Sequence, residues 1–270
     1  ENGRMAHERA GKPAQESDLI DVDAVLSAYH DITPDPSNPD QMVVFGTSGH
    51  RGSSLDGAFN DAHIAATTQA IVEYRASQGI DGPLFIGKDT HALSMPAWTT
   101  AIEVLRANDV EVVAEHDDEW TPTPAVSRAI IVHNRLSEGR QADGIVVTPS
   151  HNPPRDGGFK YNPPTGGPAP AEATDWIAKR ANEYIAAGLD GVKRTPVSGV
   201  LDERAGKFDY LDHYVADLGN VVDMDAIKAS GLRIGADPMG GASVDYWGAI
   251  GERYGLNLEV VNPHVDATWR

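Results

Sequence analysis

The feature that most constrains this chain is a repeated alternation of short apolar runs with longer segments of helical periodicity. Apolar runs typical of buried strands occupy residues 83–87, 110–114 and 144–148. Helical spacing occupies residues 61–77, 94–108, 123–134 and 171–187. Strands that alternate with helices of this length predict a three-layer α/β/α domain around a mainly parallel mixed sheet. Such sheets bind ligands beyond the carboxyl ends of their strands, where we expect the loops 46–52 and 148–158.

The alternation starts again near the end of the chain. A helical pattern over residues 242–254 lies between two short apolar runs, 232–235 and 256–261. We therefore predict three parts: an N-terminal tail with a short helix (1–40), a first domain (41–205), and linker helices with the start of a second related α/β domain (206–270). A lone βαβ unit cannot cover both faces of its sheet. Either the second domain is unusually small, or the chain is a fragment of a longer protein.

The charge balance excludes several classes of partner. The 270 residues include 22 basic and 40 acidic side chains, for a net charge of -18. Such a surface repels nucleic acid and anionic membranes, so neither is expected as a general partner. There is no cysteine, which excludes disulfides and thiolate chemistry. No apolar run approaches the ~20 residues that span a bilayer, so the sequence predicts a soluble cytoplasmic protein.

The most informative motif is Val147-Thr-Pro-Ser-His-Asn-Pro-Pro154, directly after a predicted strand. Prolines on both sides restrict the backbone, so the Ser150 hydroxyl is presented with little entropy to lose. His151 is placed to donate a hydrogen bond or exchange a proton near neutral pH. The plainer interpretation is an ordinary turn, because an Asn-Pro pair and a serine next to a proline are ordinary turn formers.

A second motif, Gly46-Thr-Ser-Gly-His-Arg-Gly52, is rich in glycine. Glycines allow backbone N–H groups to converge on an anion, and the Arg51 guanidinium suits phosphate. We expect five consecutive residues to bind phosphate here: Thr47, Ser48, Gly49, His50 and Arg51. The motif matches neither a Walker loop nor a dinucleotide-binding fingerprint. The alternative is a flexible surface loop with a solvated arginine.

A third candidate is Lys160, ten residues after Ser150 and beyond a pair of glycines. A lone lysine is usually a solvated surface charge. Here, however, the serine, the histidine, the arginine and the lysine all map to one edge of the predicted sheet. In a chain this acidic, that edge predicts a local basic pocket for an anionic small molecule, with phosphate the natural candidate.

These motifs resemble the α-D-phosphohexomutase superfamily, and within it the bacterial phosphoglucomutases. Residues 148–153 are similar to its phosphoserine loop, residues 46–52 to its N-terminal active-site loop, and residues 158–161 to the segment with its active-site lysine. Residues 210–214 and 235–241 resemble the entry to its second domain. The resemblance implies a four-domain enzyme about twice this length that interconverts glucose 1-phosphate and glucose 6-phosphate.

The same resemblance implies the roles of individual residues. Ser150 is expected to be phosphorylated, to pass its phosphoryl group to the sugar, and to bind Mg²⁺ through that phosphate. Arg51 and Lys160 would surround the transferring group, and His151 would neighbour it. The intermediate and activator would be glucose 1,6-bisphosphate. The family's aspartate-rich metal loop and its sugar-reading loops do not occur in this sequence, so we expect the remaining domains to supply them and the isolated chain to be nearly inactive.

Three alternatives stay open at this point. The hexose is not fixed, because a phosphomannomutase or a phosphoglucosamine mutase would have a similar serine loop. A non-catalytic module that binds sugar phosphates would have the same motifs. A Ser-His hydrolase is disfavoured, because the G-x-S-x-G elbow is missing and adjacent serine and histidine side chains point in different directions.

Overall fold

A computed structural model describes residues 9–46, 49–115, 119–137, 139–197 and 206–269. Its strands form a six-stranded sheet in the order β1-β5-β4-β2-β3-β6 and a two-stranded sheet of β7 and β8. The strands are β1 His50–Ser53, β2 Leu84–Lys88, β3 Val112–Glu115, β4 Asp143–Val147, β5 Asp156–Asn162, β6 Gly206–Phe208, β7 Ile234–Ala236 and β8 Leu258–Val260. The three strands predicted from apolar runs correspond to β2, β3 and β4.

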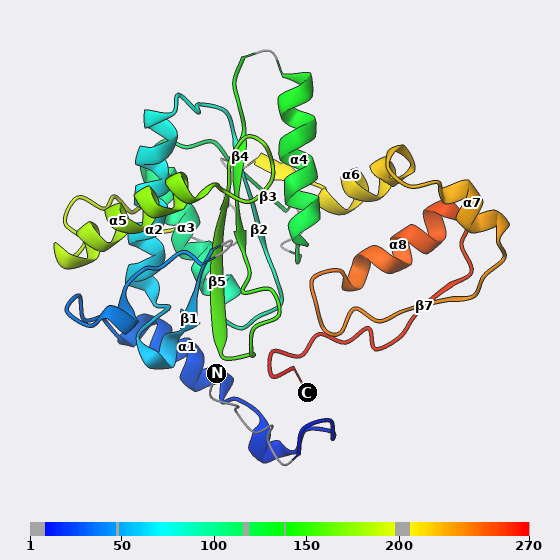
Figure 1. Ribbon diagram of the computed structural model, residues 1–270, viewed down its shortest axis with the longest axis horizontal. Coiled ribbons are helices and arrows are strands. Elements are labelled where there is room, and N and C mark those ends of the chain that lie inside the picture. The colour runs from blue at the N-terminus through cyan, green and yellow to red at the C-terminus, as the bar shows by residue number, and fades with distance from the viewer. Residues whose placement is uncertain (1–8, 47–48, 116–118, 138, 198–205, 270) are drawn as a thin grey trace.

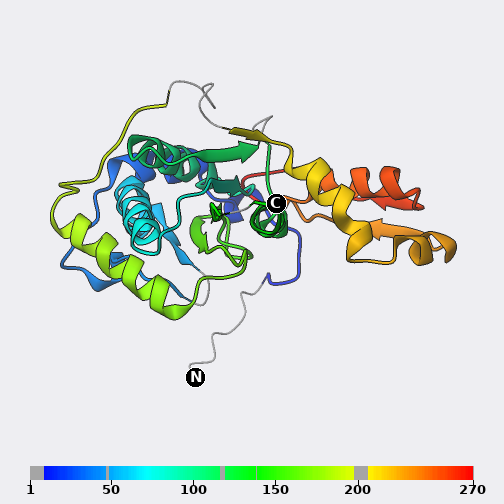
Figure 2. The ribbon, with the colours of Figure 1, turned by 90° about the horizontal axis from the view of Figure 1, so that it is seen from above.

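Helices cover both faces of the large sheet, as the alternation predicts (Figures 1 and 2). The α-helices are α1 Val22–Asp31, α2 Asp61–Ser77, α3 Ser94–Ala107, α4 Thr123–Leu136, α5 Ala171–Ala186, α6 Tyr210–Asp217, α7 Met224–Ala229 and α8 Val244–Tyr254. Short 3-10 helices occupy Glu16–Asp18, Pro39–Gln41, Ser54–Asp56 and Leu218–Asn220. The three-layer α/β/α architecture with a mainly parallel mixed sheet is therefore confirmed.

The central strands divide their side chains between two hydrophobic clusters. Leu84 and Ile86 of β2 pack into the cluster that contains α2, α3 and α5. Phe85, between them, packs on the opposite face with α4 and α6. Because successive side chains of a strand point to opposite faces, a strand buried on both faces has an uninterrupted apolar sequence. This is why β2 and β4 could be predicted from short apolar runs.

The edge strand β1 and its neighbour β5 differ from the prediction, which placed 46–52 and 148–158 in loops. β5 pairs antiparallel with β4, and β1 pairs antiparallel with β5. Their sequences are polar and rich in glycine, so they carry no apolar signal for a strand. Gly52 shows why glycine is needed, because a Cβ there would lie 2.7 Å from the carbonyl oxygen of Ala58. The extended conformation of these segments is set by tertiary packing rather than by propensity.

A buried ion pair fixes the start of β4. Arg75 of α2 donates from Nε to both carboxylate oxygens of Asp143, at 2.9 and 2.8 Å. The Tyr161 hydroxyl of β5 donates to the same carboxylate at 2.8 Å. Burial raises the pKa of Asp143 to about 6, against the opposing effects of Arg75 and Tyr161. The network ties α2, β4 and β5 together, and so fixes the two strands that lead into and out of the serine motif.

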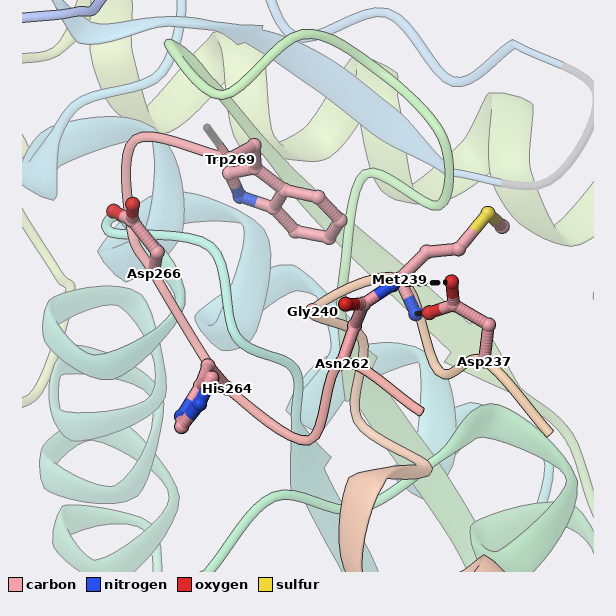
Figure 3. Close-up of a pocket in the computed structure, with 7 residues that line it drawn as sticks. All are labelled: Asp237, Met239, Gly240, Asn262, His264, Asp266 and Trp269. Atoms are coloured by element: carbon pink, nitrogen blue, oxygen red, sulfur yellow. Dashed lines mark hydrogen bonds between the residues drawn. The ribbon is translucent and has the colours of Figure 1, made fainter. Parts of the chain in front are cut away.

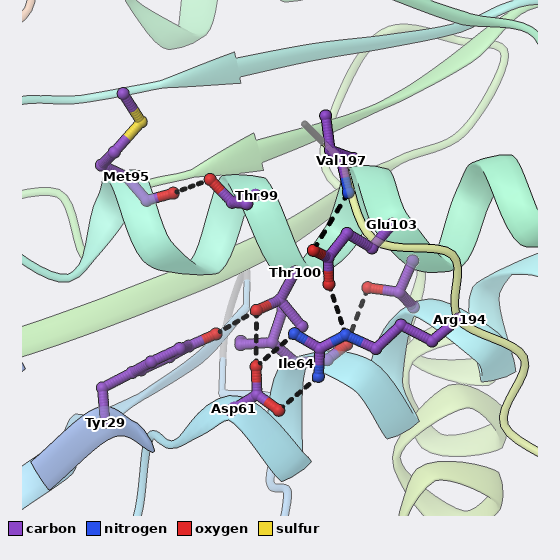
Figure 4. Close-up of polar contacts among 10 residues, drawn as sticks. Tyr29, Asp61, Ile64, Met95, Thr99, Thr100, Glu103, Arg194 and Val197 are labelled. Atoms are coloured by element: carbon purple, nitrogen blue, oxygen red, sulfur yellow. Dashed lines mark hydrogen bonds and ion pairs between the residues drawn. The ribbon is translucent and has the colours of Figure 1, made fainter. Parts of the chain in front are cut away.

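A second polar network attaches the segment after α5 to the body of the domain (Figure 4). Arg194 pairs with Asp61 of α2 and with Glu103 of α3. Thr100 donates to Asp61 at 2.7 Å and accepts from the Tyr29 hydroxyl at 3.0 Å. Asp61 is the acidic residue in the first turn of α2, whose N-cap is Asn60.

The last part of the chain forms the expected second βαβ unit. β7 and β8 are parallel, and α8 connects them. α8 packs on α6, and α6 packs on α4 of the larger layer structure. The predicted division at residue 206 places Gly206–Phe208 in the second unit, yet β6 pairs with β3 as the last strand of the first sheet. Among the described helices, none has the length and apolarity required to cross a membrane.

Candidate functional site

The serine motif forms a tight turn at the carboxyl end of β4, which we call the serine turn (residues 148–155). Ser150 is exposed and has a φ of 68°, in the left-handed region. That conformation costs a non-glycine residue about 1–2 kcal/mol, so contacts around the turn must hold it in place. One of them is local: the Ser150 N–H donates to Oγ1 of Thr148 at 2.9 Å.

Two glycines let neighbouring segments approach the serine turn closely. A Cβ on Gly158 of β5 would lie 2.2 Å from the carbonyl oxygen of Thr148 and 2.4 Å from Cα of Pro149. A Cβ on Gly49 would lie 2.6 Å from Cγ of Lys160. Real Cβ atoms do not approach other atoms this closely. Glycine at 158 therefore allows β5 to pass directly under the turn, and glycine at 49 leaves room for the lysine stem.

Lys160 of β5 reaches the serine hydroxyl directly. Its Nζ donates to Oγ of Ser150 at 2.8 Å. The pKa of Lys160 is lowered, first by burial and then by the nearby charge of Arg51, while Asp89 opposes the shift. The ammonium therefore releases a proton more readily than a solvated lysine does. If Oγ is the leaving atom of a group bound to Ser150, an ammonium that donates to it stabilises the alkoxide that forms and can protonate it.

Arg51 of β1 lies against the same turn. It is paired in register with Gly158, and its Nε donates to the carbonyl oxygen of Pro149 at 3.0 Å. This contact places a guanidinium beside the residue that precedes Ser150. The structure thus brings Ser150, Lys160 and Arg51 together, from three different segments of the chain.

Of the two histidines expected at the site, His50 lies apart from this group. His50 points into the core, where its ring stacks between Phe59 (5.8 Å between centroids) and His63 (5.5 Å). Burial, with a contribution from His63, lowers the pKa of His50 to about 4. A neutral, buried imidazole does not line a phosphate pocket, because its side chain is behind the strand that presents Arg51. His151 is exposed beside Ser150.

The remaining residues of the glycine-rich motif divide into two groups. Thr47 and Ser48 lie outside the described residues. Gly49 is described, and its backbone passes over the stem of Lys160 as noted above. Its carbonyl oxygen accepts a hydrogen bond from the N–H of Gly46 at 3.0 Å, which closes the loop just before β1.

The loop after β2 adds residues that the motif analysis missed. Asp89 follows Lys88, the last residue of β2, and shares a small cavity of about 120 Å³ with Thr148, Ser150 and Trp269. Burial raises the pKa of Asp89, but hydrogen bonds from His91, Ser94 and Thr148 outweigh it and lower the pKa overall. The sequence signal was available: these residues follow a predicted strand at the same sheet edge, where ligand sites collect.

A larger cavity of about 600 Å³ adjoins the site on the side of the second unit (Figure 3). Asp237 organises one wall, since it accepts from the N–H of Met239 and from Nδ2 of Asn262, both at 2.8 Å. Trp269 lines both this cavity and the smaller one beside Ser150. The second unit therefore forms one side of the space in front of the serine turn.

The described residues do not make a metal site by themselves. No group of three or more histidine, aspartate or glutamate side chains is arranged to hold an ion within the described ranges. The exposed Ser150 hydroxyl is a point where a phosphate would contribute a ligand, but hard cations such as Mg²⁺ require several oxygen ligands.

Together, the sheet and the serine turn define an α/β/α domain that presents an exposed serine between a lysine and an arginine. Residues 42–187 match the family model described as phosphoglucomutase/phosphomannomutase, alpha/beta/alpha domain I. A phosphoglucomutase of Komagataeibacter xylinus is 52% identical over 262 residues, which is 97% of this chain and 47% of the relative. The chain belongs to the phosphoglucomutase/phosphomannomutase family.

More distant relatives share part of the chain. A cytoplasmic phosphoglucomutase of Bromus inermis is 31% identical over 201 residues, 68% of this chain and 34% of the relative. A phosphoglucosamine mutase of Synechococcus sp. is 27% identical over 230 residues, 83% of this chain and 44% of the relative. The chain spans about half the length of the K. xylinus relative and less of the others.

Solved structures show the same fold at low sequence identity. A Thermus thermophilus protein described as a phosphomannomutase superimposes with a TM-score of 0.69 at 22% identity, covering 84% of this chain and 47% of that one. The open form of a Paramecium phosphoglucomutase, parafusin, gives a TM-score of 0.67 at 22% identity, covering 86% and 45%. These likenesses support the architecture described above.

Proposed function

We propose that this chain contains the phosphoryl-carrying serine of a phosphoglucomutase, an enzyme that interconverts glucose 1-phosphate and glucose 6-phosphate through glucose 1,6-bisphosphate. The single observation that carries the proposal is the 2.8 Å hydrogen bond from Nζ of Lys160 to Oγ of Ser150. Arg51, which donates to the adjacent Pro149 carbonyl, places a second cation at the same turn. The serine would carry the phosphate, and the two cations would balance its charge.

In the transfer step, the bond between phosphorus and Oγ of Ser150 breaks, and a bond forms between phosphorus and a sugar hydroxyl oxygen. The sugar hydroxyl gives its proton to solvent water, and Oγ gains negative charge as it leaves. Lys160 already donates to that oxygen, and its lowered pKa favours release of a proton to it. Because phosphoryl transfer proceeds through a loose transition state, catalysis depends mainly on positioning and charge neutralisation.

In the reverse direction the same groups exchange roles. A neutral Lys160 amine accepts the proton of the Ser150 hydroxyl as Oγ attacks the other phosphate of the bisphosphate, and Arg51 stays beside the turn. His151 is exposed next to Ser150 and would contact the incoming sugar phosphate. His50 is assigned a packing role under β1, so the phosphate contacts fall to Arg51, Lys160 and the backbone at Gly49.

Glucose is the proposed sugar because the relative with 52% identity is a phosphoglucomutase. A phosphomannomutase or phosphoglucosamine mutase is the alternative, in line with the Synechococcus relative. Mg²⁺ would supply counter-charge to the phosphate on Ser150, with its other ligands and the sugar-reading residues in further domains of the same enzyme. The proposal also includes a cytoplasmic location, which the name of the B. inermis relative supports.

The test is an intact-mass measurement after incubation with glucose 1,6-bisphosphate and Mg²⁺. The chain is tested alone and with the separately produced C-terminal half of the K. xylinus relative, which supplies the part of the enzyme beyond the matched residues. We expect a gain of one phosphate that disappears in Ser150→Ala. Ser77→Ala, a change of an exposed serine at the end of α2, should leave the gain intact.

Two results would overturn the proposal. Absence of any phosphate gain in both preparations would leave a non-catalytic sugar-phosphate module as the better explanation. Covalent labelling of Ser150 by a fluorophosphonate probe, without phosphate uptake from the bisphosphate, would instead indicate a serine hydrolase. The Lys160 contact makes the second outcome unexpected, because the group that reaches Oγ is an ammonium and not an imidazole.

A further inference from the structure

The serine turn is held from both ends by two residues of the loop after β2, Asp89 and His91. On one side, Thr148 links them to the nucleophile: its Oγ1 accepts from the Ser150 N–H at 2.9 Å, and its hydroxyl donates to Asp89. On the other side, Nε2 of His91 lies 3.2 Å from the carbonyl oxygen of Asn152. Ser150, with its left-handed backbone, is the residue midway between these two attachments.

Asp89 and His91 are themselves joined into one unit. Nδ1 of His91 lies 3.1 Å from Oδ2 of Asp89, and the His91 N–H donates to Oδ1 at 3.0 Å. The Ser94 hydroxyl at the start of α3 donates to the same carboxylate. His91 is only 3% exposed. A buried pair with this many contacts has little freedom to change its geometry.

The chemistry of the two attachments restricts which side chain serves at position 91. A carboxylate and a backbone carbonyl both accept hydrogen bonds, so a side chain between them must donate in both directions. The imidazole does this when both ring nitrogens bear hydrogen. The indole of Trp269 packs on the imidazole, with 4.4 Å between ring centroids, and Oγ1 of Thr90 donates to the Gly240 carbonyl at 2.7 Å. These contacts from the second unit cover the pair on its outer side.

We infer that Asp89 and His91 form a positioning pair that holds Ser150 in its strained conformation, with Oγ directed at Lys160. The inference rests on the proposed function of Ser150 and extends it to residues that touch neither the phosphate nor the sugar. Without the pair, Thr148 and the Asn152 carbonyl lose their common attachment to the loop after β2. The turn would then sample ordinary backbone conformations in which Oγ leaves Nζ of Lys160.

The test compares three variants at one position with a histidine far from the site. His91→Ala removes both donors. His91→Gln offers one donor group and one acceptor, so it satisfies only one attachment. His91→Arg has a longer side chain that donates in both directions. His30→Ala, a change of an exposed histidine on α1, is the matched control, and thermal melts followed by circular dichroism identify which variants are folded.

Two readouts separate the inference from the proposed function. The first is amide hydrogen exchange of the serine turn, which needs no substrate: we expect it to be at least about tenfold faster in His91→Ala and in His91→Gln than in the parent chain. The second is phosphate uptake by Ser150 from glucose 1,6-bisphosphate. In His91→Ala and His91→Gln the maximal rate of uptake should fall by about 10–100-fold, while the concentration of glucose 1,6-bisphosphate that gives half the maximal rate stays the same. His91→Arg should recover both readouts, and His30→Ala should change neither.

Several outcomes would overturn the inference. The inference fails if folded His91→Ala or His91→Gln keeps the parent's amide exchange in the serine turn and the parent's rate of phosphate uptake. It also fails if the exchange and uptake rates of His91→Arg equal those of His91→Gln. If His91→Ala fails to fold, the comparison between the glutamine and arginine variants decides. If the parent chain takes up no phosphate in any preparation, the proposed function fails, while the exchange measurement still shows whether the pair holds the turn.

Discussion

Replacing Gly158 with alanine tests the packing of β5 under the serine turn. The added Cβ would lie 2.2 Å from the Thr148 carbonyl oxygen and 2.4 Å from Cα of Pro149. Both are backbone atoms, so no side-chain rotation relieves the contact. Overpacking usually costs about 1–3 kcal/mol, and a collision with backbone belongs at the upper end. We expect the free energy of unfolding to fall by about 3 kcal/mol.

The assay is denaturant unfolding followed by circular dichroism, with a thermal melt as a second measurement. For a chain of this size, about 3 kcal/mol corresponds to a decrease in Tm of roughly 6–12 °C. Gly167→Ala is the matched control, because a Cβ there meets no atom within 4 Å and its φ is not in the left-handed region. Its free energy of unfolding should stay within about 0.5 kcal/mol of the parent.

The same substitution should also impair the site, because the backbone that must yield is the backbone that holds Ser150. We expect slower phosphate uptake from glucose 1,6-bisphosphate in Gly158→Ala than in Gly167→Ala. A Gly158→Ala chain as stable and as reactive as the Gly167→Ala control would refute the claim that β5 and the serine turn require this close approach.

Three further predictions concern charge and helix propensity. Lys160→Met, which keeps much of the apolar stem but removes the charge, should lower the initial rate of phosphate uptake by Ser150 by about 10²–10³-fold, and a rate equal to the parent would argue against a role for the ammonium. Burial holds the pKa of His50 at about 4 against an ordinary 6.5, so only the unfolded chain binds this proton between those values. The free energy of unfolding should therefore fall as the pH drops from about 6.5 to about 4. In urea titrations over that range, the free energy of unfolding of His50→Gln should fall by about 2–3 kcal/mol less than that of the parent chain; equal decreases would contradict the burial of a neutral His50. Gly248→Ala, at an exposed position within α8 where a Cβ meets nothing, should raise the free energy of unfolding by about 0.5–1 kcal/mol, and any decrease would show that the position is constrained.

The central layers could be predicted from sequence because their signals are local. Strands such as Asp143–Val147 are buried on both faces, and an uninterrupted apolar run records this directly. β1 and β5 have no such run. They are extended because glycines at positions such as 52 and 158 allow close backbone approach, which depends on partners distant in the sequence. β6 has three residues and pairs with β3 across some ninety residues of chain, so its sequence contains too little to identify it.

The site could be predicted as a set of residues but not as an arrangement. Ser150 follows the carboxyl end of β4, where ligand sites are expected, and the neighbouring antiparallel strands β5 and β1 bring Lys160 and Arg51 beside it. The direction of the His50 side chain is not foreseeable in this way, since adjacent residues of a strand point to opposite sides and only the packed core shows which side is buried. Asp89 and His91 were missed because they belong to a different strand end from the recognised motifs.

The central claim is that Ser150 is the residue that carries phosphate, held by Lys160 and Arg51. It is tested most directly by tandem mass spectrometry of peptides from the protein after exposure to isotopically labelled glucose 1,6-bisphosphate. The account predicts the label on the peptide that contains Ser150, with fragment ions that place it on that residue, and much less label in Lys160→Met. Label on another residue, or equal labelling of Ser150 with and without the lysine, would contradict it.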